Sequence, residues 1–324
     1  MKALLCKAFG PIDTLAVEDL PAPEPKAGEV LIRVRAAGVN FPDALIVQGL
    51  YQFKPPFPFA PGSEAAGEVI AVGPGVTRVR PGQRVAAITY WGAFAEQIVV
   101  PEAHVLVMPD EMPFDQAGAM LLTYGTCWHG LVDRANLKAG ESVLVLGAAG
   151  GIGVAAIEVA KALGARVIAA ASSAEKLAVA REHGADDLID YSKEDLRARL
   201  KDLVGANGVD VIVDPVGGSY AEPALRSIAW RGRFLVIGFA AGDIPRIPLN
   251  LALLKGCSIV GVFYGEFLKR EPAAAQADAQ AMFDAFRAGK LRPHVSAHYP
   301  LADGVKAILD VANRKALGKI VVQP

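Results

Sequence analysis

The stretch "SVLVLGAAGGIGVAAIEVAKALG", from Ser142 to Gly164, decides the fold of this chain. It begins as an apolar strand, continues through a glycine-rich turn, and ends as an apolar helix that Gly164 terminates. A strand without polar positions has both faces covered, as in a parallel sheet with helices on each side. The stretch therefore predicts one βα unit of such a sheet.

Further βα units follow this stretch along the chain. The segments 165–171, 186–191 and 208–214 predict strands, and the segments 174–184 and 193–205 between them predict helices. Two more apolar runs follow at 232–240 and 257–265. This alternation predicts an α/β domain built on a parallel sheet.

The chain before this region has a different pattern. From Met1 to about Val107, short β-rich runs alternate with turns rich in glycine and proline, which predicts an irregular, antiparallel, barrel-like domain. An alanine-rich helix is expected at 273–289. The closing segment, 294–324, returns to strand and helix patterns and is assigned to the first domain.

Composition excludes several kinds of partner. The 324 residues carry a formal net charge of -1, which gives no electrostatic reason to expect nucleic acid or an anionic membrane. The apolar stretch at the N-terminus ends at Lys7 and is shorter than that of a signal peptide, so a cytoplasmic protein is expected. Cys6, Cys127 and Cys257 lie far apart, which indicates reduced thiols.

The turn "LGAAGGIG" has the pattern of a dinucleotide site. Read as GxGxxG, its positions are Ala148, Gly150 and Gly153, with alanine in place of the first glycine. Small residues let the backbone approach a pyrophosphate, and the following helix directs its N-terminal amides at it. The alternative is a tight turn that only packs helix on sheet.

The end of the second strand bears on the choice between NAD and NADP. An NAD site usually has an acidic residue here, but "VIAAASSAEK" has no carboxylate before Glu175. Ser172, Ser173 and Lys176 offer hydroxyls and a cation suited to a 2'-phosphate, which favours NADP. Ser172 and Glu175 also fit a capping box that starts the next helix.

A zinc site is not expected. His294 and His298 have the spacing of a helical metal pair, but "RPHVSAHYP" is bounded by prolines and predicts extended backbone. In a strand the two side chains would lie about 13 Å apart, beyond the reach of one ion. The sequence also lacks a cluster of four cysteines.

Several motifs together carry a family resemblance: "AAGVNFPD" (36–43), "PFAPGSEAAGEV" (58–69), "GAAGGIG" (147–153), "GADDLIDY" (184–191) and "GKIVV" (318–322). Over nearly its whole length the chain resembles the zinc-free quinone oxidoreductase branch of the medium-chain dehydrogenase/reductases, which contains zeta-crystallin. The resemblance implies a Rossmann nucleotide-binding domain at 123–263 and a β-rich GroES-like catalytic domain formed by 1–122 and 264–324.

The same resemblance explains the absence of zinc ligands. Zinc-dependent relatives have a cysteine where this chain has Asn40, and a histidine where it has Ser63 beside Glu64. Their loop that holds a structural zinc has no counterpart between "GQRVAAITY" and "GAFAEQIVV". The resemblance therefore implies an enzyme that works without metal.

The resemblance also implies site residues. Asn40, Tyr51 and Thr126 are expected near the nicotinamide and substrate; alternatively, they are a turn former, a partly buried aromatic and a helix cap. Asp43 either caps the helix after Pro42 or orients the cofactor side of the site. The expected cofactor-binding residues are Gly147, Ala149, Gly150, Gly151, Ile152, Gly153, Ser172, Ser173, Lys176, Tyr191, Gly238, Phe239, Ala240, Val262, Phe263 and Lys319.

Without a Lewis acid, the substrate needs its own electron sink. Quinones and α,β-unsaturated carbonyl compounds have one, so we expect an NADPH-dependent reductase of such acceptors, with Asn40, Tyr51 or water as hydrogen-bond donors. An enoyl thioester such as an acryloyl-CoA is a second possibility, for which Lys54, Arg231 and Arg246 are the only cations to name. A non-catalytic, crystallin-like NADPH-binding protein is a third.

The apolar run near Cys257 to Val262 predicts the last strand of the nucleotide domain. In relatives such a strand pairs with its copy across a two-fold axis, so a homodimer through this edge is expected. The alternative is a strand covered by its own domain.

Overall fold

The computed structural model describes all 324 residues, and its contacts divide the chain into two compact units. Unit 1 comprises residues 1–122, 271–283 and 293–324, and unit 2 comprises residues 123–270 and 284–292. This division differs from the expected one, in which all of 264–324 belongs to the first domain. Residues 264–270 lie in unit 2 because Phe267 stacks on His129, with 3.9 Å between ring centroids.

Unit 2 is built on a six-stranded parallel sheet with the strand order β10-β9-β8-β11-β12-β13. The strands are β8 (Ser142–Leu146), β9 (Arg166–Ala171), β10 (Asp187–Asp190), β11 (Val209–Asp214), β12 (Ile228–Val236) and β13 (Ser258–Gly261). The helices are α3 (Thr123–Trp128), α4 (Gly151–Ala162), α5 (Ala174–Glu182), α6 (Leu196–Val204), α7 (Ala221–Arg226), α8 (Asn250–Lys255) and α9 (Tyr264–Arg270). The predicted α/β domain with a parallel sheet is confirmed.

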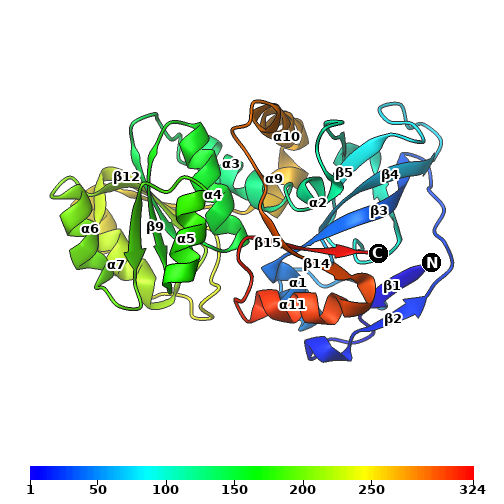
Figure 1. Ribbon diagram of the computed structural model, residues 1–324, viewed down its shortest axis with the longest axis horizontal. Helices are drawn as coiled ribbons and strands as arrows, with labels where there is room; N and C mark the ends of the chain where they lie inside the picture. Colours follow the sequence, from blue (N-terminus) through cyan, green and yellow to red (C-terminus); the bar gives the residue numbers. More distant parts are fainter. The chain divides into compact units, whose positions relative to one another are not determined.

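Helices cover this sheet on both faces, as the fully buried strand β8 requires. Along β8, Leu144 and Leu146 join a core cluster with Leu200 of α6 and Leu225 of α7. The alternate positions face the other way, and α4 packs against β8 and β9 while α5 packs against β9 and β10. Figure 1 shows α4 and α5 in green lying along the strands.

Unit 1 is built on a seven-stranded sheet that is antiparallel except for the pair β14 and β15. Its path is β14-β15-β3-β4-β5-β7, and β6 pairs with β3; β1 and β2 form a separate antiparallel pair. The strands are β1 (Lys2–Leu5), β2 (Ala16–Asp19), β3 (Glu29–Val39), β4 (Glu64–Val72), β5 (Arg84–Ile88), β6 (Gln97–Pro101), β7 (Val105–Val107), β14 (Val295–Pro300) and β15 (Lys319–Gln323). The helices are α1 (Phe41–Val47), α2 (Phe114–Gly118) and α11 (Gly304–Ala312).

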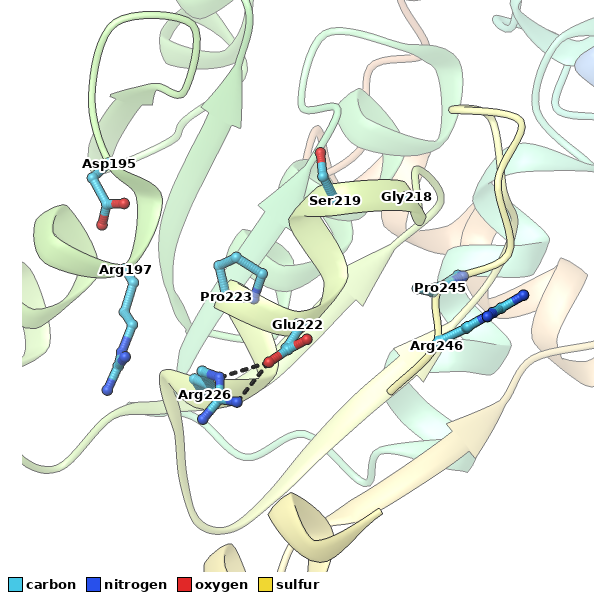
Figure 2. A pocket seen from close by; sticks show the side chains of 9 residues that line it. All are labelled: Asp195, Arg197, Gly218, Ser219, Glu222, Pro223, Arg226, Pro245 and Arg246. Atoms are coloured by element: carbon cyan, nitrogen blue, oxygen red, sulfur yellow. Dashed lines mark hydrogen bonds and ion pairs between the residues drawn. The ribbon is translucent and has the colours of Figure 1, made fainter. Parts of the chain in front are cut away.

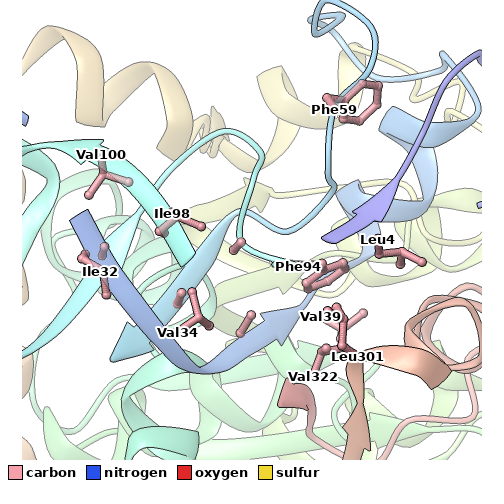
Figure 3. Packing of buried hydrophobic residues seen from close by; sticks show 14 of the residues in the cluster. Leu4, Ile32, Val34, Val39, Phe59, Phe94, Ile98, Val100, Leu301 and Val322 are labelled. Carbon is pink, nitrogen blue, oxygen red and sulfur yellow. The ribbon is translucent and has the colours of Figure 1, made fainter. Parts of the chain in front are cut away.

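The C-terminal strand completes this sheet, because β15 pairs with β3 across Ile320 and Val39. Figure 3 shows the resulting core, in which Val322 and Leu301 from the C-terminal segment pack near Val39 and Phe94. The expectation that residues 294–298 are extended is also met, since they lead into and form part of β14. The C-terminal segment is thus part of the same sheet and core as the N-terminal strands.

The long alanine-rich helix predicted near 273–289 is α10 (Pro272–Arg287). None of the helices combines the length and the apolarity that crossing a bilayer would take.

Candidate functional site

All but one of the expected cofactor-binding residues follow the carboxyl ends of strands in the sheet of unit 2. In a parallel sheet these ends lie along one edge, where ligands of such folds bind. The segments that reach this edge are 147–153 after β8, 172–176 after β9, Tyr191 after β10, 238–240 after β12, and 262–263 after β13. The exception is Lys319, which lies in β15 of unit 1.

The glycine-rich turn has room for a ligand at one glycine and none at another. A Cβ at Gly153 would lie 2.4 Å from the carbonyl oxygen of Gly147, so this glycine lets α4 pack against the turn. A Cβ at Gly150 would have no neighbour closer than 3.5 Å, which leaves its outer side open. Gly150 is also the N-cap of the 12-residue helix α4. The turn therefore offers a helix N-terminus without side chains in front of it, which suits a pyrophosphate.

The residues expected at the 2'-phosphate lie together. The Lys176 ammonium donates to Ser172 Oγ at 3.2 Å, and the Tyr191 amide donates to the Ala171 carbonyl oxygen at 3.1 Å, which places Tyr191 beside the end of β9. The capping box expected from Ser172 and Glu175 is wrong by one residue. Ser173 is the N-cap, because its backbone is extended and its Oγ accepts the Lys176 amide at 3.3 Å.

The loops after β11 and β12 are held to each other. The Gly238 amide donates to the Asp214 carbonyl oxygen at 3.3 Å, and the Ala240 amide to that of Pro215 at 3.1 Å. The Asp214 carboxylate accepts the amides of Val216 and Gly217 at 2.8 Å each. Burial raises the pKa of Asp214, although these two hydrogen bonds oppose the shift. Asp214 thus fixes the turn that supports the expected cofactor residues 238–240.

Lys319 lies inside unit 1 with its ammonium surrounded by oxygen atoms. It donates to Glu64 Oε1 at 2.8 Å, to the Val39 carbonyl oxygen at 3.0 Å, and to Asn40 Oδ1. Lys319 is 3% exposed and Glu64 is fully buried. Gly38 admits the Glu64 carboxylate, since a Cβ there would lie 2.5 Å from Glu64 Oε1. With three acceptors, the ammonium is a structural cation in the core of this unit.

Asn40 has its whole side-chain amide engaged in the same network. Its Nδ2 donates to Glu64 Oε1 at 2.9 Å and to the Gly38 carbonyl oxygen at 3.2 Å, while its Oδ1 accepts from Lys319. The ammonium of Lys319 can only donate and the carboxylate of Glu64 accepts, so these two groups determine the positions of Oδ1 and Nδ2 in the Asn40 amide. Both amide hydrogens are therefore used within the protein, and neither is left to donate to a substrate oxygen.

Asp43 caps helix α1, the first of the two roles left open by the sequence. Its Oδ2 accepts the backbone amide of Asn40, the N-cap residue, at 2.7 Å, and its Oδ1 accepts that of Gly62 at 3.1 Å. Burial raises the pKa of Asp43 to about 7, against the opposing effects of these hydrogen bonds and of the Lys319 charge. Asp43 therefore ties α1 to the loop at residues 60–63.

Tyr51 and Thr126 differ from Asn40. Tyr51 is half-buried, and its hydroxyl makes no hydrogen bond to the protein. Burial raises the pKa of Tyr51, and the nearby Asp43 carboxylate raises it further. Thr126 is buried in α3 of unit 2. The structure thus leaves Tyr51 with an available donor in the same unit as the polar cluster.

The polar cluster of Asn40, Asp43, Glu64 and Lys319 does not fit a catalytic zinc. Zinc sites are built from thiolate, imidazole and carboxylate ligands. Here Asn40 and Ser63 offer neither a thiolate nor an imidazole. Of the two carboxylates beside them, Glu64 is bound to an ammonium and Asp43 accepts the backbone amides of Asn40 and Gly62. A metal ion would have to displace Lys319 from both Glu64 and Asn40.

A surface hollow of 460 Å³ on unit 2 involves none of the expected catalytic or cofactor-binding residues, although Arg246, one of the cations named for an enoyl thioester, lines it. Figure 2 shows Arg226 bonded to Glu222 within it, with Arg197 and Arg246 apart from them. Its lining is Asp195, Arg197, Gly218, Ser219, Glu222, Pro223, Arg226, Pro245 and Arg246. Acidic and basic side chains of nearly equal number leave this hollow without a clear ligand preference.

The ion pair of Glu64 and Lys319 was not predicted from the sequence. One signal was present in the sequence. Glu64 begins the segment "EAAGEV", whose small residues indicate a strand that enters a core, and a charge buried there needs a partner of opposite sign. Its partner lies 255 residues away, at a position assigned instead to the cofactor. Pattern within one segment cannot reveal a pair of this kind.

Comparison with known proteins agrees with the fold of the two units. Residues 26–110 match the family described as "Alcohol dehydrogenase GroES-like domain", and residues 151–282 match the family described as "Zinc-binding dehydrogenase". The chain is 38% identical to a quinone oxidoreductase-like protein 2 homolog of Nematostella vectensis, over 99% of this chain and 88% of the relative. It is 36% identical to a quinone oxidoreductase of Pseudomonas aeruginosa, over 100% and 99%.

Solved structures give the same result. The quinone oxidoreductase of Escherichia coli complexed with NADPH matches with a TM-score of 0.92 and 28% identity, over 100% of both chains. A mycobacterial protein complexed with NADPH matches with a TM-score of 0.92 and 33% identity, again over 100% of both. The fold and these matches define a medium-chain dehydrogenase/reductase. Within that superfamily, the chain belongs to the quinone oxidoreductase family.

Proposed function

We propose that this protein is an NADPH-dependent reductase that passes a hydride to quinones or to α,β-unsaturated carbonyl compounds. The observation that carries the proposal is the convergence of the expected dinucleotide residues on one edge of the sheet in unit 2, from the open Gly150 turn to Ser172 and Lys176. Two structural relatives that are complexed with NADPH support the choice of cofactor.

Different residues at this edge of the sheet would hold different groups of NADPH. The N-terminus of α4 at Gly150 to Gly153 suits the pyrophosphate, and Ser172, Ser173 and Lys176 suit the 2'-phosphate. When bound, the cofactor supplies the hydride. The protein supplies binding and orientation, and a hydrogen bond to the oxygen of the acceptor.

The polar groups of unit 1 favour an acceptor that stabilises its own negative charge. Glu64 is not free to hold a Lewis acid, since Lys319 neutralises it inside the core and has all its ammonium hydrogens bonded to protein oxygens. The Tyr51 hydroxyl is the available donor, and it can hydrogen-bond the carbonyl oxygen on which charge develops. With one hydride from the cofactor and one proton from solvent, a quinone becomes a hydroquinone and an enone becomes a saturated ketone.

The test is a panel of acceptors assayed in parallel with NADPH and NADH. The panel includes 1,4-benzoquinone, 1,4-naphthoquinone, an acyclic enone and an enoyl thioester. Turnover of quinones or enones, with lower KM for NADPH, is the expected result. Oxidation of NADPH by the thioester alone would overturn the proposed substrate class, and NADPH binding without turnover of any acceptor would favour a non-catalytic role.

A further inference from the structure

Four aromatic side chains from two loops of unit 1 form a connected group, which we name the aromatic platform: Tyr51, Phe53, Tyr90 and Trp91. Phe53 is its centre. The ring centroid of Phe53 lies 4.9 Å from that of Tyr51, 5.2 Å from that of Tyr90 and 6.2 Å from that of Trp91. The first two contacts are edge-on, at 80° and 82°, which is a favoured arrangement of aromatic pairs.

The platform is open to solvent on one side. Tyr51 and Phe53 are half-buried and pack against the core of unit 1, whereas Trp91 is 36% exposed. Tyr90 is also half-buried, and its ring contacts both Phe53 and Trp91. Exposed aromatic surface next to a donor hydroxyl is unusual for a purely structural cluster, because packing alone would be served better by full burial.

Hydrogen bonds join the platform to the buried polar cluster. The Thr89 amide donates to the Ser63 carbonyl oxygen at 2.8 Å, and the Thr89 hydroxyl donates to the Trp91 carbonyl oxygen at 3.0 Å. The same 60–63 loop reaches Asp43 through the Gly62 amide. The positions of Tyr90 and Trp91 are therefore fixed relative to Asp43, whose charge also acts on Tyr51.

We propose that the aromatic platform is a specificity-determining surface that selects flat, ring-bearing acceptors, namely quinones and aryl enones, over acyclic enones and acyl thioesters. The proposal rests on the proposed function, which it narrows. A planar conjugated acceptor can stack on the faces of these rings or pack against their edges. In either position its carbonyl oxygen can accept a hydrogen bond from the Tyr51 hydroxyl. An acyclic chain has no ring face to offer and gains less from the same surface.

The test compares two leucine variants of phenylalanines in the same loop. Phe53→Leu keeps an apolar side chain but removes the ring that contacts the other three. Phe57→Leu is the matched control, because Phe57 is 43% exposed and its ring contacts only Phe9 and Phe59. Each variant is assayed for kcat/KM with 1,4-naphthoquinone and with 3-penten-2-one. Trp91→Leu serves as a second variant if Phe53→Leu fails to fold.

The expected result is a loss of about five- to tenfold in kcat/KM of Phe53→Leu for the naphthoquinone, with less than a twofold change for the acyclic enone. Phe57→Leu should change neither. Equal losses for both acceptors, or no loss for either, would overturn the proposal, because the platform would then shape the loops and not select the ring.

A binding measurement separates this proposal from the proposed function. Quenching of Trp91 fluorescence by 1,4-naphthoquinone, without NADPH and corrected for absorbance, reports contact with the platform itself; Trp91→Leu gives the background from Trp128 and Trp230. If the wild type reduces neither acceptor, the proposed function fails, yet quenching that weakens in Phe53→Leu would uphold the platform. Absence of quenching attributable to Trp91 would overturn it.

Discussion

The ammonium of Lys319 lies 2.8 Å from Oε1 of Glu64, and both side chains are almost completely shielded from water, at 3% and 0% exposure. The pair joins β15 at the end of the chain to β4 near its beginning, and the amide of Asn40 bridges the two charges. In this chain a lysine supplies the positive charge that the buried carboxylate needs.

Lys319→Met should therefore destabilise the protein strongly. Removing one partner of a buried ion pair leaves the other charge without compensation, at a cost of roughly 3–5 kcal/mol. Urea unfolding measures the change in free energy. Lys315→Met is the control, since Lys315 is exposed and its ion pair with Asp310 spans 3.6 Å. Adding Glu64→Gln to Lys319→Met should restore part of the loss; a single variant as stable as the wild type would contradict this account.

Asp43 should make stability depend on pH below neutrality. Its pKa is about 7 in the folded protein, against an ordinary value of 3.8 that applies to the unfolded chain. Between these two pH values the folded state therefore binds a proton that the unfolded state does not. Stability from this group is then present below about pH 4 and falls as pH rises to about 7, by at most about 1.4 kcal/mol per pH unit. Lys319 opposes this shift and Glu64 adds to it.

The measurement is urea unfolding of the wild type and of Asp43→Asn at several values between pH 5 and pH 8. The wild type should lose stability relative to Asp43→Asn as pH rises to 7, and the difference should then level off. Asp13→Asn, at an exposed position, is the control for removal of one carboxylate. A constant difference across the range would mean that Asp43 stays charged throughout.

Glu158 should be important for the stability of unit 2. It is a buried carboxylate of α4 whose Oε2 accepts the Tyr124 hydroxyl at 2.9 Å and the Arg292 amide at 2.7 Å, and whose Oε1 lies 2.6 Å from His183 Nδ1. Glu158→Gln turns one acceptor into a donor that faces other donors, at a cost of about 2–4 kcal/mol. Thermal unfolding should show a lower Tm. The exposed Glu182→Gln should leave it unchanged.

The fold was largely predictable from the sequence, whereas the polar core of unit 1 was not. The βα units follow from local patterns, because strands such as β8 and helices such as α4 reveal themselves by hydrophobicity and glycine position. Lys319 and Glu64 meet only after β15 pairs with β3 and β3 with β4. Asn40 was expected to act on the substrate. The hydrogen-bond partners of its side-chain amide depend on these strand pairings, which a local sequence pattern does not contain.

Lys176 should determine the preference for NADPH over NADH. Its ammonium and the hydroxyls of Ser172 and Ser173 are at the end of β9, and the segment 165–174 contains no acidic residue. Loss of a charge-assisted hydrogen bond costs about 1.5–3 kcal/mol, so Lys176→Met should raise the Kd of NADPH about 10- to 100-fold and leave that of NADH nearly unchanged. Fluorescence titration measures both. Lys201→Met, at an exposed position of α6, is the control, and equal weakening of both cofactors would exclude the phosphate contact.

The outer edge of the sheet in unit 2 should pair with a second copy of the chain. β13 pairs with no strand other than β12. Exposed apolar side chains lie on it and on neighbouring elements: Ile259 at 40%, Trp230 at 70% and Leu253 at 80% exposure. Trp230 packs close to Gly256 at the end of α8, so these elements adjoin. We propose that this apolar edge is the interface of a homodimer.

Light scattering tests the dimer directly. The wild type should have twice the chain mass of 34.0 kDa, and Ile259→Asp should shift the protein toward the monomer, because the charge would be buried at the two-fold axis without a partner. Leu50→Asp is the matched control, since Leu50 is 68% exposed and belongs to unit 1. A wild-type monomer at micromolar concentration would contradict the proposal, and so would an Ile259→Asp variant that remains fully dimeric.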